Sequence, residues 1–249
     1  MNFKKYILSV LLVALWVTWC TKVYSQSKDE KNMKELLVHK IHHEGQTGIS
    51  DVKKLLESNA PLNAINVINW EKFDYTPEVQ FRIGHVENEI WIVFYVREKH
   101  ILAKRTATNS STHKDSCVEF FIDPKKDGQY YNFEFNAIGT THLAHGPVVQ
   151  KRSFIDPAMI DSLIRTHSSL GTQPIDLQNG VHSWDLTVVI PAEILIHENT
   201  KTISGLIANA NFYKCGDETI EPHYLSWNPV PVERPSFHQP QYFGRLVFE

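Results

Sequence analysis

Short runs of alternating apolar and polar residues fill the chain from about residue 60 to its end, and a period of two is typical of half-buried β-strands. Turn-forming clusters separate these runs. The runs QFRIGHV and EIWIVFYV flank Glu87-Asn88-Glu89 and predict a β-hairpin. Further runs of the same kind are CVEFFI, YYNFEFNAIG, HSWDLTVVIP, ISGLIANANFYK and FGRLVFE.

Helical periodicity is confined to one short segment. A helix can begin at Ser50-Asp51, with Val52, Leu55 and Leu56 on one face. Because many strands follow without alternating helices, the pattern predicts an all-β fold. The expected architecture is an antiparallel β-sandwich, jelly-roll-like, with a short N-terminal helix.

The segments between the clear strands give weaker signals. Residues 34–41, KELLVHKI, are expected to form an edge strand, and residues 150–180 a long connection. With 249 residues, of which 42% are hydrophobic, the chain can bury one substantial core. We expect a single domain over residues 26–249, with its core at about 60–249.

The first 25 residues have the pattern of a secretory signal peptide. Lys4 and Lys5 precede an apolar run from Tyr6 to about Trp19, and cleavage is expected after Ser25. The run is about 14 residues long, shorter than the roughly 20 that a membrane-spanning helix needs. We therefore expect an exported protein, periplasmic or secreted, with no transmembrane segment in the mature chain.

An alternative interpretation makes Cys20 a lipidated N-terminus, although the bulky Trp19 stands where lipoprotein signals usually carry a small residue. Removal of residues 1–25 would take three lysines and change the formal net charge from −3 to −6. A mildly acidic chain without a basic stripe does not suit nucleic acid or anionic membranes.

Two neighbouring strands of the predicted sheet carry polar residues at alternate positions. Pairing CVEFFI with YYNFEFN across the turn DPKKDGQ joins their apolar sides into core. The opposite side then displays Glu119, Asn132, Glu134 and Asn136. The segment IANANFYKC repeats the design, with Asn209, Asn211 and Tyr213 on its polar side.

This combination of carboxylates, amides and rings suits a sugar. A pyranose has hydroxyl groups around its rim, which carboxylates and amides can bind, and C–H bonds on its face, which aromatic rings can cover. The alternative is that these residues only solvate the outer side of a sandwich, as alternating polar residues usually do. The pattern by itself leaves both interpretations open.

Two segments resemble family 9 carbohydrate-binding modules. SCVEFFIDP (116–124), followed by YYNFEFNAIG, is similar to the signature hairpin of that family. LSWNP (225–229) and FHQPQYFGRLVF (237–248) are similar to its closing pattern. The resemblance covers about residues 60–249 and implies a jelly-roll-like β-sandwich, non-catalytic glycan binding and, in some members, structural calcium. Such modules often assist enzymes of polysaccharide breakdown.

The resemblance also implies site residues. It assigns the binding-face glutamate to Glu119 and the two sugar-sandwiching tryptophans to His113 and Phe237. Glu134 stands in place of an arginine, with Asn136 at the nearby polar position. A His–Phe pair offers less stacking area than two indoles, and Glu for Arg reverses a charge. The remaining candidates for carbohydrate contact are Asn211, Tyr213, Trp227 and His238, although Trp227 is favoured as a packing residue.

Cysteine and acidic positions add two further hypotheses. Cys117 and Cys215 could form a disulfide in an oxidising compartment if their strands are neighbours. Asp123 and Asp127, in the hairpin turn, are weak calcium candidates. The 13 histidines match no familiar transition-metal motif. We therefore expect no cofactor apart from the possible calcium ion.

Two alternative functions stay open. A glycoside hydrolase would use Glu119 and Glu134 as its carboxylate pair, but an open sheet face would leave both wet and without the raised pKa that an acid catalyst needs. A haem or redox-binding sandwich of DOMON-like shape would need axial ligands, and Met33 and Met159 lie in poor contexts for that role. An exported, non-catalytic protein that binds an oligo- or polysaccharide is the leading hypothesis.

Overall fold

The computed structural model describes residues 33–43, 47–198 and 202–249. The expected signal peptide, residues 1–25, and the alternative lipidation site Cys20 lie outside the described residues. Glu35–Glu249 forms one compact unit. In the part of the chain that is described, no helix is long and apolar enough to cross a membrane.

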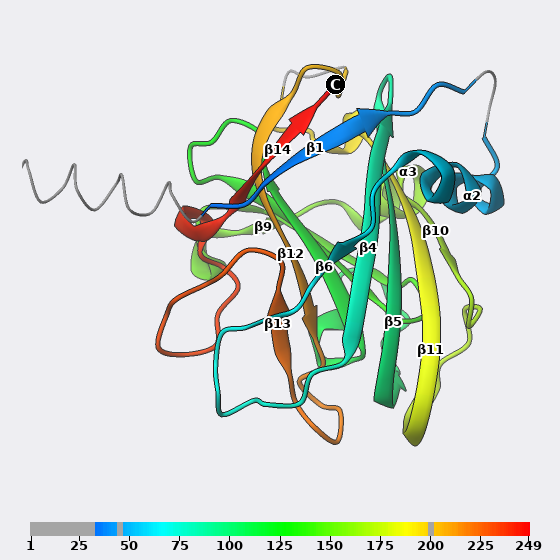
Figure 1. Ribbon diagram of the computed structural model, residues 1–249, viewed down its shortest axis with the longest axis vertical. Helices are drawn as coiled ribbons and strands as arrows, with labels where there is room; N and C mark the ends of the chain where they lie inside the picture. Colours follow the sequence, from blue (N-terminus) through cyan, green and yellow to red (C-terminus); the bar gives the residue numbers. More distant parts are fainter. Residues whose placement is uncertain (1–32, 44–46, 199–201) are drawn as a thin grey trace, which may run out of the picture. The chain divides into compact units, whose positions relative to one another are not determined.

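The strands follow one hydrogen-bonded path that makes two layers joined at β1 (Figure 1). The first layer has the order β10-β11-β5-β4-β1, and β2 pairs with β4. The bounds of its strands are β1 (Glu35–Lys40), β2 (Asn63–Ala64), β4 (Glu78–Val86), β5 (Glu89–Ala103), β10 (Arg165–Ser168) and β11 (Ile175–Pro191).

The second layer continues from β1 in the order β14-β12-β6-β7-β8-β9, and β13 joins β12 to β3. Its strands are β3 (Val67–Ile68), β6 (Cys117–Asp123), β7 (Tyr130–Asn136), β8 (Thr141–Gly146), β9 (Ser153–Phe154), β12 (Ile207–Cys215), β13 (Tyr224–Ser226) and β14 (Gly244–Phe248). The predicted hairpins β4–β5 and β6–β7 are both confirmed.

The expectation of a purely antiparallel sandwich is wrong at β1. This strand runs parallel to β14 on one side and, through His39 and Lys40, parallel to β4 on the other. It is therefore not the edge strand that its sequence suggests, because both of its flanks have a hydrogen-bonded neighbour. The sheet is mixed, and β1 is the strand that connects the two layers.

The main core lies between the layers. Phe81 of β4 and Phe94 of β5 meet Phe212 of β12, and the rings of Phe81 and Phe212 stack at 3.9 Å between centroids. Phe120 of β6 extends the stack, 4.9 Å from Phe212. All four side chains are fully buried. At about 25 cal/mol per Å² of apolar surface, residues of this size supply much of the free energy that holds the layers together.

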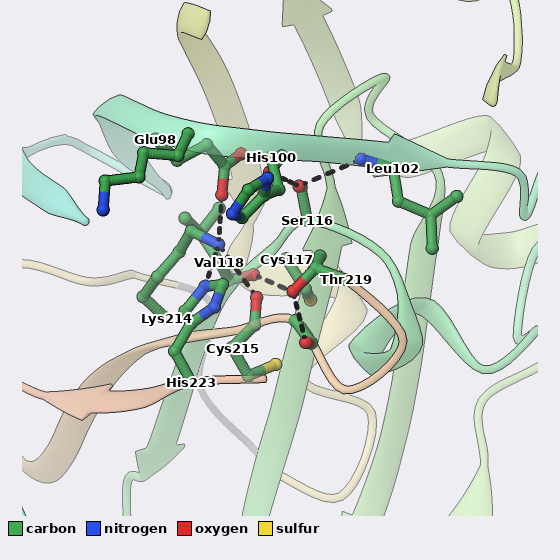
Figure 2. A network of polar contacts seen from close by, with 12 residues as sticks. Glu98, His100, Leu102, Ser116, Cys117, Val118, Lys214, Cys215, Thr219 and His223 are labelled. Atoms are coloured by element: carbon green, nitrogen blue, oxygen red, sulfur yellow. Dashed lines mark hydrogen bonds and ion pairs between the residues drawn. The ribbon is translucent and has the colours of Figure 1, made fainter. Parts of the chain in front are cut away.

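A buried ion pair also links the layers. Lys214 Nζ of β12 lies 2.9 Å from a carboxylate oxygen of Glu98 of β5, and both side chains are completely inaccessible to solvent. Figure 2 shows Lys214 directed toward Glu98 and His223. The ammonium group contacts His223 Nε2 at 2.7 Å and donates to the carbonyl oxygen of Cys215, while Trp184 Nε1 donates to Glu98 at 2.7 Å. The two charges therefore have partners on several strands.

Helices are few in the described residues. α2 (Ile49–Asn59) includes the segment for which the sequence predicts a short helix, and it buries Val52 and Leu56 against Trp91 and Val189 on the outer side of the first layer. Residues 150–180 are not the expected long connection, since they contain β9, α3 (Pro157–Leu163), β10 and the start of β11. Short 3-10 turns are η1 (Thr112–Lys114), η2 (Val149–Lys151), η3 (Ala192–Ile194) and η4 (Pro240–Tyr242).

Candidate functional site

The polar side of β6 and β7 is covered rather than open. Glu119 is 3% and Glu134 4% exposed, so the expectation of wet carboxylates is wrong. The cover is part of a second apolar cluster. In this cluster, side chains from segments remote in the sequence pack on those of the strands. Its buried members are Trp70, Cys117, Phe121, Tyr130, Tyr213, Cys215, Val230, Phe237 and Phe243.

A cavity of about 270 Å³ remains between the strands and this cover. Five of the predicted sugar-contact residues line it: His113, Glu119, Glu134, Phe237 and His238. The other residues around it are Val149, Cys215, Asp217, Tyr224, Pro235 and Ser236. Its volume lies just below the roughly 300–1,000 Å³ of pockets that enclose drug-sized ligands, so the cavity suits a single small ring.

Strand register brings the acidic residues together. Glu119 of β6 is directly opposite Glu134 of β7, and Glu134 is directly opposite His142 of β8. On the other flank Tyr213 of β12 is opposite Glu119. Since directly opposed residues share a face, one row of polar side chains crosses four strands at the floor of the site.

Glu134 is stabilised as a carboxylate. Burial alone raises the pKa of its side chain, but the hydrogen bond with His113 and the nearby imidazoles of His142 and His238 outweigh burial and lower that pKa to about 2. His113 Nδ1 lies 3.6 Å from Oε2, and Asn132 Nδ2 donates to Oε1 at 2.7 Å. In return, Glu134 raises the pKa of His113. The pair offers a ligand an anionic acceptor beside an imidazole donor.

Glu119 has the opposite preference. Burial, followed by the charge of Glu134, raises the pKa of its carboxyl group well above the ordinary value. Among the described residues, its one side-chain hydrogen-bond partner is a thiol, since Cys215 Sγ donates to Oε1 at 3.1 Å. A protonated carboxyl group can both donate and accept a hydrogen bond. The two opposed glutamates thus present different hydrogen-bonding chemistry to the cavity.

The rings of the site are held by other rings. Tyr213 stacks on Phe237 with centroids 4.2 Å apart and an interplanar angle of 14°. Phe237 is therefore only 8% exposed and is not the free aromatic that its Pro-flanked loop suggests. His238 Nδ1 lies 2.8 Å from the hydroxyl of Tyr130, and burial lowers the pKa of His238 to about 4. The side chain of His113 is the more open one, at 40% exposed.

Four predicted contact residues do not line the cavity and instead support the framework. Asn136 Nδ2 donates to the carbonyl of Arg105 and to Asp115. Asn211 exchanges hydrogen bonds with the backbone of Asn228. Alternation along a strand identifies the side of the sheet, but it does not say which positions on that side meet the cavity.

Tyr213 and Trp227 are the two aromatic residues among the predicted contacts that do not line the cavity. Tyr213 is fully buried beneath Phe237, to whose carbonyl its hydroxyl donates at 3.2 Å. Trp227 is 4% exposed and packs edge-on against Phe212 in the main core, 5.8 Å between centroids, which is the packing role that the sequence favours.

Sequence reasoning missed several lining residues. Tyr224 begins β13, which continues into the LSWNP segment, and Asp217 lies two residues beyond the end of β12. Burial raises the pKa of Asp217, while His113 opposes that shift. Their closeness to Cys215 in the sequence could have indicated them, because Cys215 alternates with Asn211 and Tyr213 on the polar side of its strand.

Metal binding has one geometric candidate among the described residues. The two thiols of Cys117 and Cys215 and a carboxylate oxygen of Glu119 all lie within 4.8 Å of one another. Burial raises the pKa of Cys117 to about 12 and also raises that of Cys215 well above its ordinary value, so both thiols are protonated and a metal would have to displace their protons. The cysteines are opposite each other in register, as the possible disulfide required, but both are free in the structure.

The calcium candidates serve the hairpin turn. Asp123 is 2% exposed and accepts the backbone N–H groups of Asp127 and Gly128, at 3.3 and 2.8 Å. Asp127 accepts the N–H of Gln129. These contacts are those of a carboxylate that caps a tight turn, in which Gly128 has a φ of +85°.

A larger cavity, about 610 Å³, lies elsewhere, beside Trp91, Glu89 and Arg165. Its rim also carries Lys40 and Glu87, which pair with each other at 3.0 Å with their side chains partly exposed. Charges that are already paired and solvated have less to gain from a ligand than buried carboxylates beside rings. We therefore take the cavity of about 270 Å³ as the candidate site, although larger cavities exist.

The fold is that of a β-sandwich with a small, partly polar cavity, and comparison with known proteins gives the family. The family model described as Carbohydrate-binding family 9 matches residues 50–248. The chain belongs to this family, whose members are non-catalytic binding modules. No curated protein matches the sequence.

Solved structures agree with that assignment. The chain is 36% identical to a proposed carbohydrate-binding protein from Bacteroides uniformis, with a TM-score of 0.84 over 87% of this chain and all of that one. Two structures of a family 9 module from Caldicellulosiruptor kristjanssonii share the fold at 13% identity, each over 87% of this chain. For the complex with glucose, the TM-score is 0.55 and 96% of that chain is covered. For the complex with cellotriose, the TM-score is 0.51 and 94% of that chain is covered.

Proposed function

We propose that this chain is an exported, non-catalytic carbohydrate-binding protein that holds one sugar ring in the 270 Å³ cavity. The single observation that carries the proposal is convergence. Residues 113, 119, 134, 237 and 238 come from distant parts of the sequence and line one cavity. Residues that only solvated the outer side of a sandwich would be open to water and would not share an enclosure.

The chemistry of the cavity suits a polyhydroxylated ring. Glu134 supplies an anionic acceptor, His113 a donor, and Glu119 a carboxyl group that can donate and accept. The imidazole of His113 and the accessible part of Phe237 give apolar surface for the C–H face of a sugar. The complexes of the Caldicellulosiruptor module with glucose and cellotriose support a saccharide as the class of ligand.

The cellular role follows from the same properties. An exported binding protein of this family would capture glycan chains or hold them near separate enzymes of polysaccharide breakdown. The pattern of residues 1–25 supports export, since a charged start precedes a short apolar run.

Affinity electrophoresis and calorimetry against a panel of soluble polysaccharides and oligosaccharides test the proposal. We expect saturable binding to at least one glycan. Glu134→Gln should weaken it about tenfold or more, because a charged acceptor becomes a neutral amide, and Phe237→Ala should weaken it through lost stacking. Glu193→Gln is the matched control, since Glu193 is an exposed glutamate on η3, outside the cavity lining.

Two results would contradict the proposal. One is the absence of binding to any glycan of the panel, and the other is binding that both site variants leave at the wild-type level. All variants should first be compared by circular dichroism and thermal unfolding, since Phe237 belongs to the covering cluster.

Glycoside hydrolysis is not part of the proposal, because the family is non-catalytic. The burial of Glu119 and Glu134 does remove the objection that both carboxyl groups would be wet. The pKa of Glu119 is raised and that of Glu134 is lowered, as in an acid–base pair. Analysis of the bound glycans for cleavage products in the same experiment checks this point. The redox alternative has less support: Met159 packs against the main core and Met33 is 39% exposed, and neither lines the cavity.

A further inference from the structure

Phe154 is a prominent exposed ring near the cavity. At 65% exposed, it matches Val181 as the most exposed of the large hydrophobic side chains that are described. It ends β9, the last strand of the second layer. Val149, 54% exposed, lies in the connection between β8 and β9 and lines the cavity itself. Exposed apolar side chains thus stand both at the cavity wall and on the last strand of the layer.

Strand register puts Phe154 on the same side of the sheet as the floor of the cavity. Phe154 is opposite Ala144 of β8, and Ala144 lies two residues after His142, so the side chains of all three share a face. The rings of Phe154 and His142 meet edge-on with centroids 5.2 Å apart. His142 Nε2 in turn lies 3.9 Å from Glu134 Oε1. A continuous line of contacts therefore runs from Glu134 to Phe154.

The backbone that carries Phe154 is anchored. Arg152 donates to the carbonyl oxygens of Gly146 and Ala144, each at 2.8 Å, and its guanidinium lies 4.2 Å from the centroid of the Tyr130 ring. Ile155 N–H donates to the carbonyl of Leu143 at 3.0 Å. An exposed ring on a fixed backbone loses little conformational entropy when it binds a flat apolar surface.

We propose that Phe154 and Val149 form a second sugar subsite, which binds the next pyranose of an oligosaccharide whose first ring occupies the cavity. This inference rests on the proposed function. The cavity has room for about one ring, so a longer ligand has to leave it, and both the exposed Val149 at its wall and the contacts from Glu134 through His142 to Phe154 lie on this side of the sheet. The exposed face of the phenyl ring would stack on the C–H face of the second sugar.

Calorimetry with ligands of increasing length tests the subsite. The probes are the mono-, di- and trisaccharides of the glycan that the panel identifies, with glucose, cellobiose and cellotriose as the first set. For Phe154→Ala we expect the trisaccharide to bind about tenfold more weakly, the loss of roughly one stacking contact, while the monosaccharide binds as in the wild type. Phe154→Trp should retain or strengthen trisaccharide binding.

Val181→Ala is the matched control, because Val181 is equally exposed but lies on β11 in the first layer. It should change neither affinity. If Phe154→Ala leaves trisaccharide binding unchanged, or weakens mono- and trisaccharide equally, the subsite is wrong and the cavity proposal stands. If the wild type binds no saccharide of any length, the proposed function fails and the subsite with it.

Discussion

Glu119 and Glu134 are the same residue type at directly opposed positions, yet their surroundings shift the pKa values of their carboxyl groups in opposite directions. The difference comes from their partners. Two imidazoles, of His113 and His142, lie within 4 Å of Glu134, whereas Glu119 has a thiol donor. Two buried carboxyl groups at opposed positions of neighbouring strands disfavour each other's ionisation, so the one beside the imidazoles keeps the charge.

This assignment predicts the effect of Glu119→Gln on stability. A carboxyl group whose pKa is raised by folding stabilises the fold while it is protonated, below the ordinary value of 4.5, and that stabilisation is lost as the pH rises through the folded pKa. We therefore expect the variant to match the wild type near pH 4 and to unfold a few degrees higher at pH 7 to 8. In a domain of this size about 1 kcal/mol corresponds to roughly 2–4 °C.

Differential scanning calorimetry between pH 4 and 8 measures this difference. Glu134→Gln is the comparison. The pKa of the Glu134 carboxyl group is lowered to about 2, so removing its charge should destabilise the fold at neutral pH. A Glu119→Gln variant that is less stable than the wild type at pH 7 would show that Glu119 is a stabilised carboxylate instead.

At the scale of elements, alternation was enough to predict β6 and β7 and the hairpin between them. Alternation also puts Lys214 on the core side of β12, in line with Ala208, Ala210 and Phe212. It gives no hint of the partner, since Glu98 belongs to a strand of the other layer and the contact depends on how the layers stack. Long-range pairing of this kind is invisible to local periodicity.

The ion pair between Glu98 and Lys214 makes a prediction at this scale. Lys214→Met should destabilise the protein by about 3–5 kcal/mol, because it leaves a buried carboxylate without its counter-charge. Combining it with Glu98→Gln should recover part of that loss, because the amide carries no charge and can still accept from Trp184.

Urea unfolding of both single variants and the double variant measures the coupling as a double-mutant cycle. Additive losses would contradict the account, because they would mean that the two side chains do not stabilise each other. Lys53→Met is the control, since Lys53 forms a partly exposed pair with Asp185 and should cost about 1 kcal/mol or less.

At the scale of the whole molecule, the sequence predicts the sandwich and the family but not the cover of the site. The resemblance brought His113, Glu119, Glu134 and Phe237 together correctly as lining residues of one cavity. Alternation added Asn211 and Tyr213, which belong to the framework, because it cannot tell a position at the cavity from one beneath the cover.

The cover itself could not be predicted, because it is made by tertiary contacts between remote segments. Trp70 lies 6.0 Å from Phe237 between ring centroids, and its Nε1 donates to the carbonyl of Val232 at 2.7 Å. These contacts shield this face of the sheet from solvent, and only the assembled structure reveals that the two glutamates are buried.

The most direct test of the central claim is a crystal structure of the protein with the glycan that binds best. The account predicts one sugar ring between His113 and Phe237, with a hydroxyl within hydrogen-bonding distance of Glu134. A saccharide bound instead in the 610 Å³ cavity beside Trp91 and Arg165, with the smaller cavity filled only by water, would contradict it.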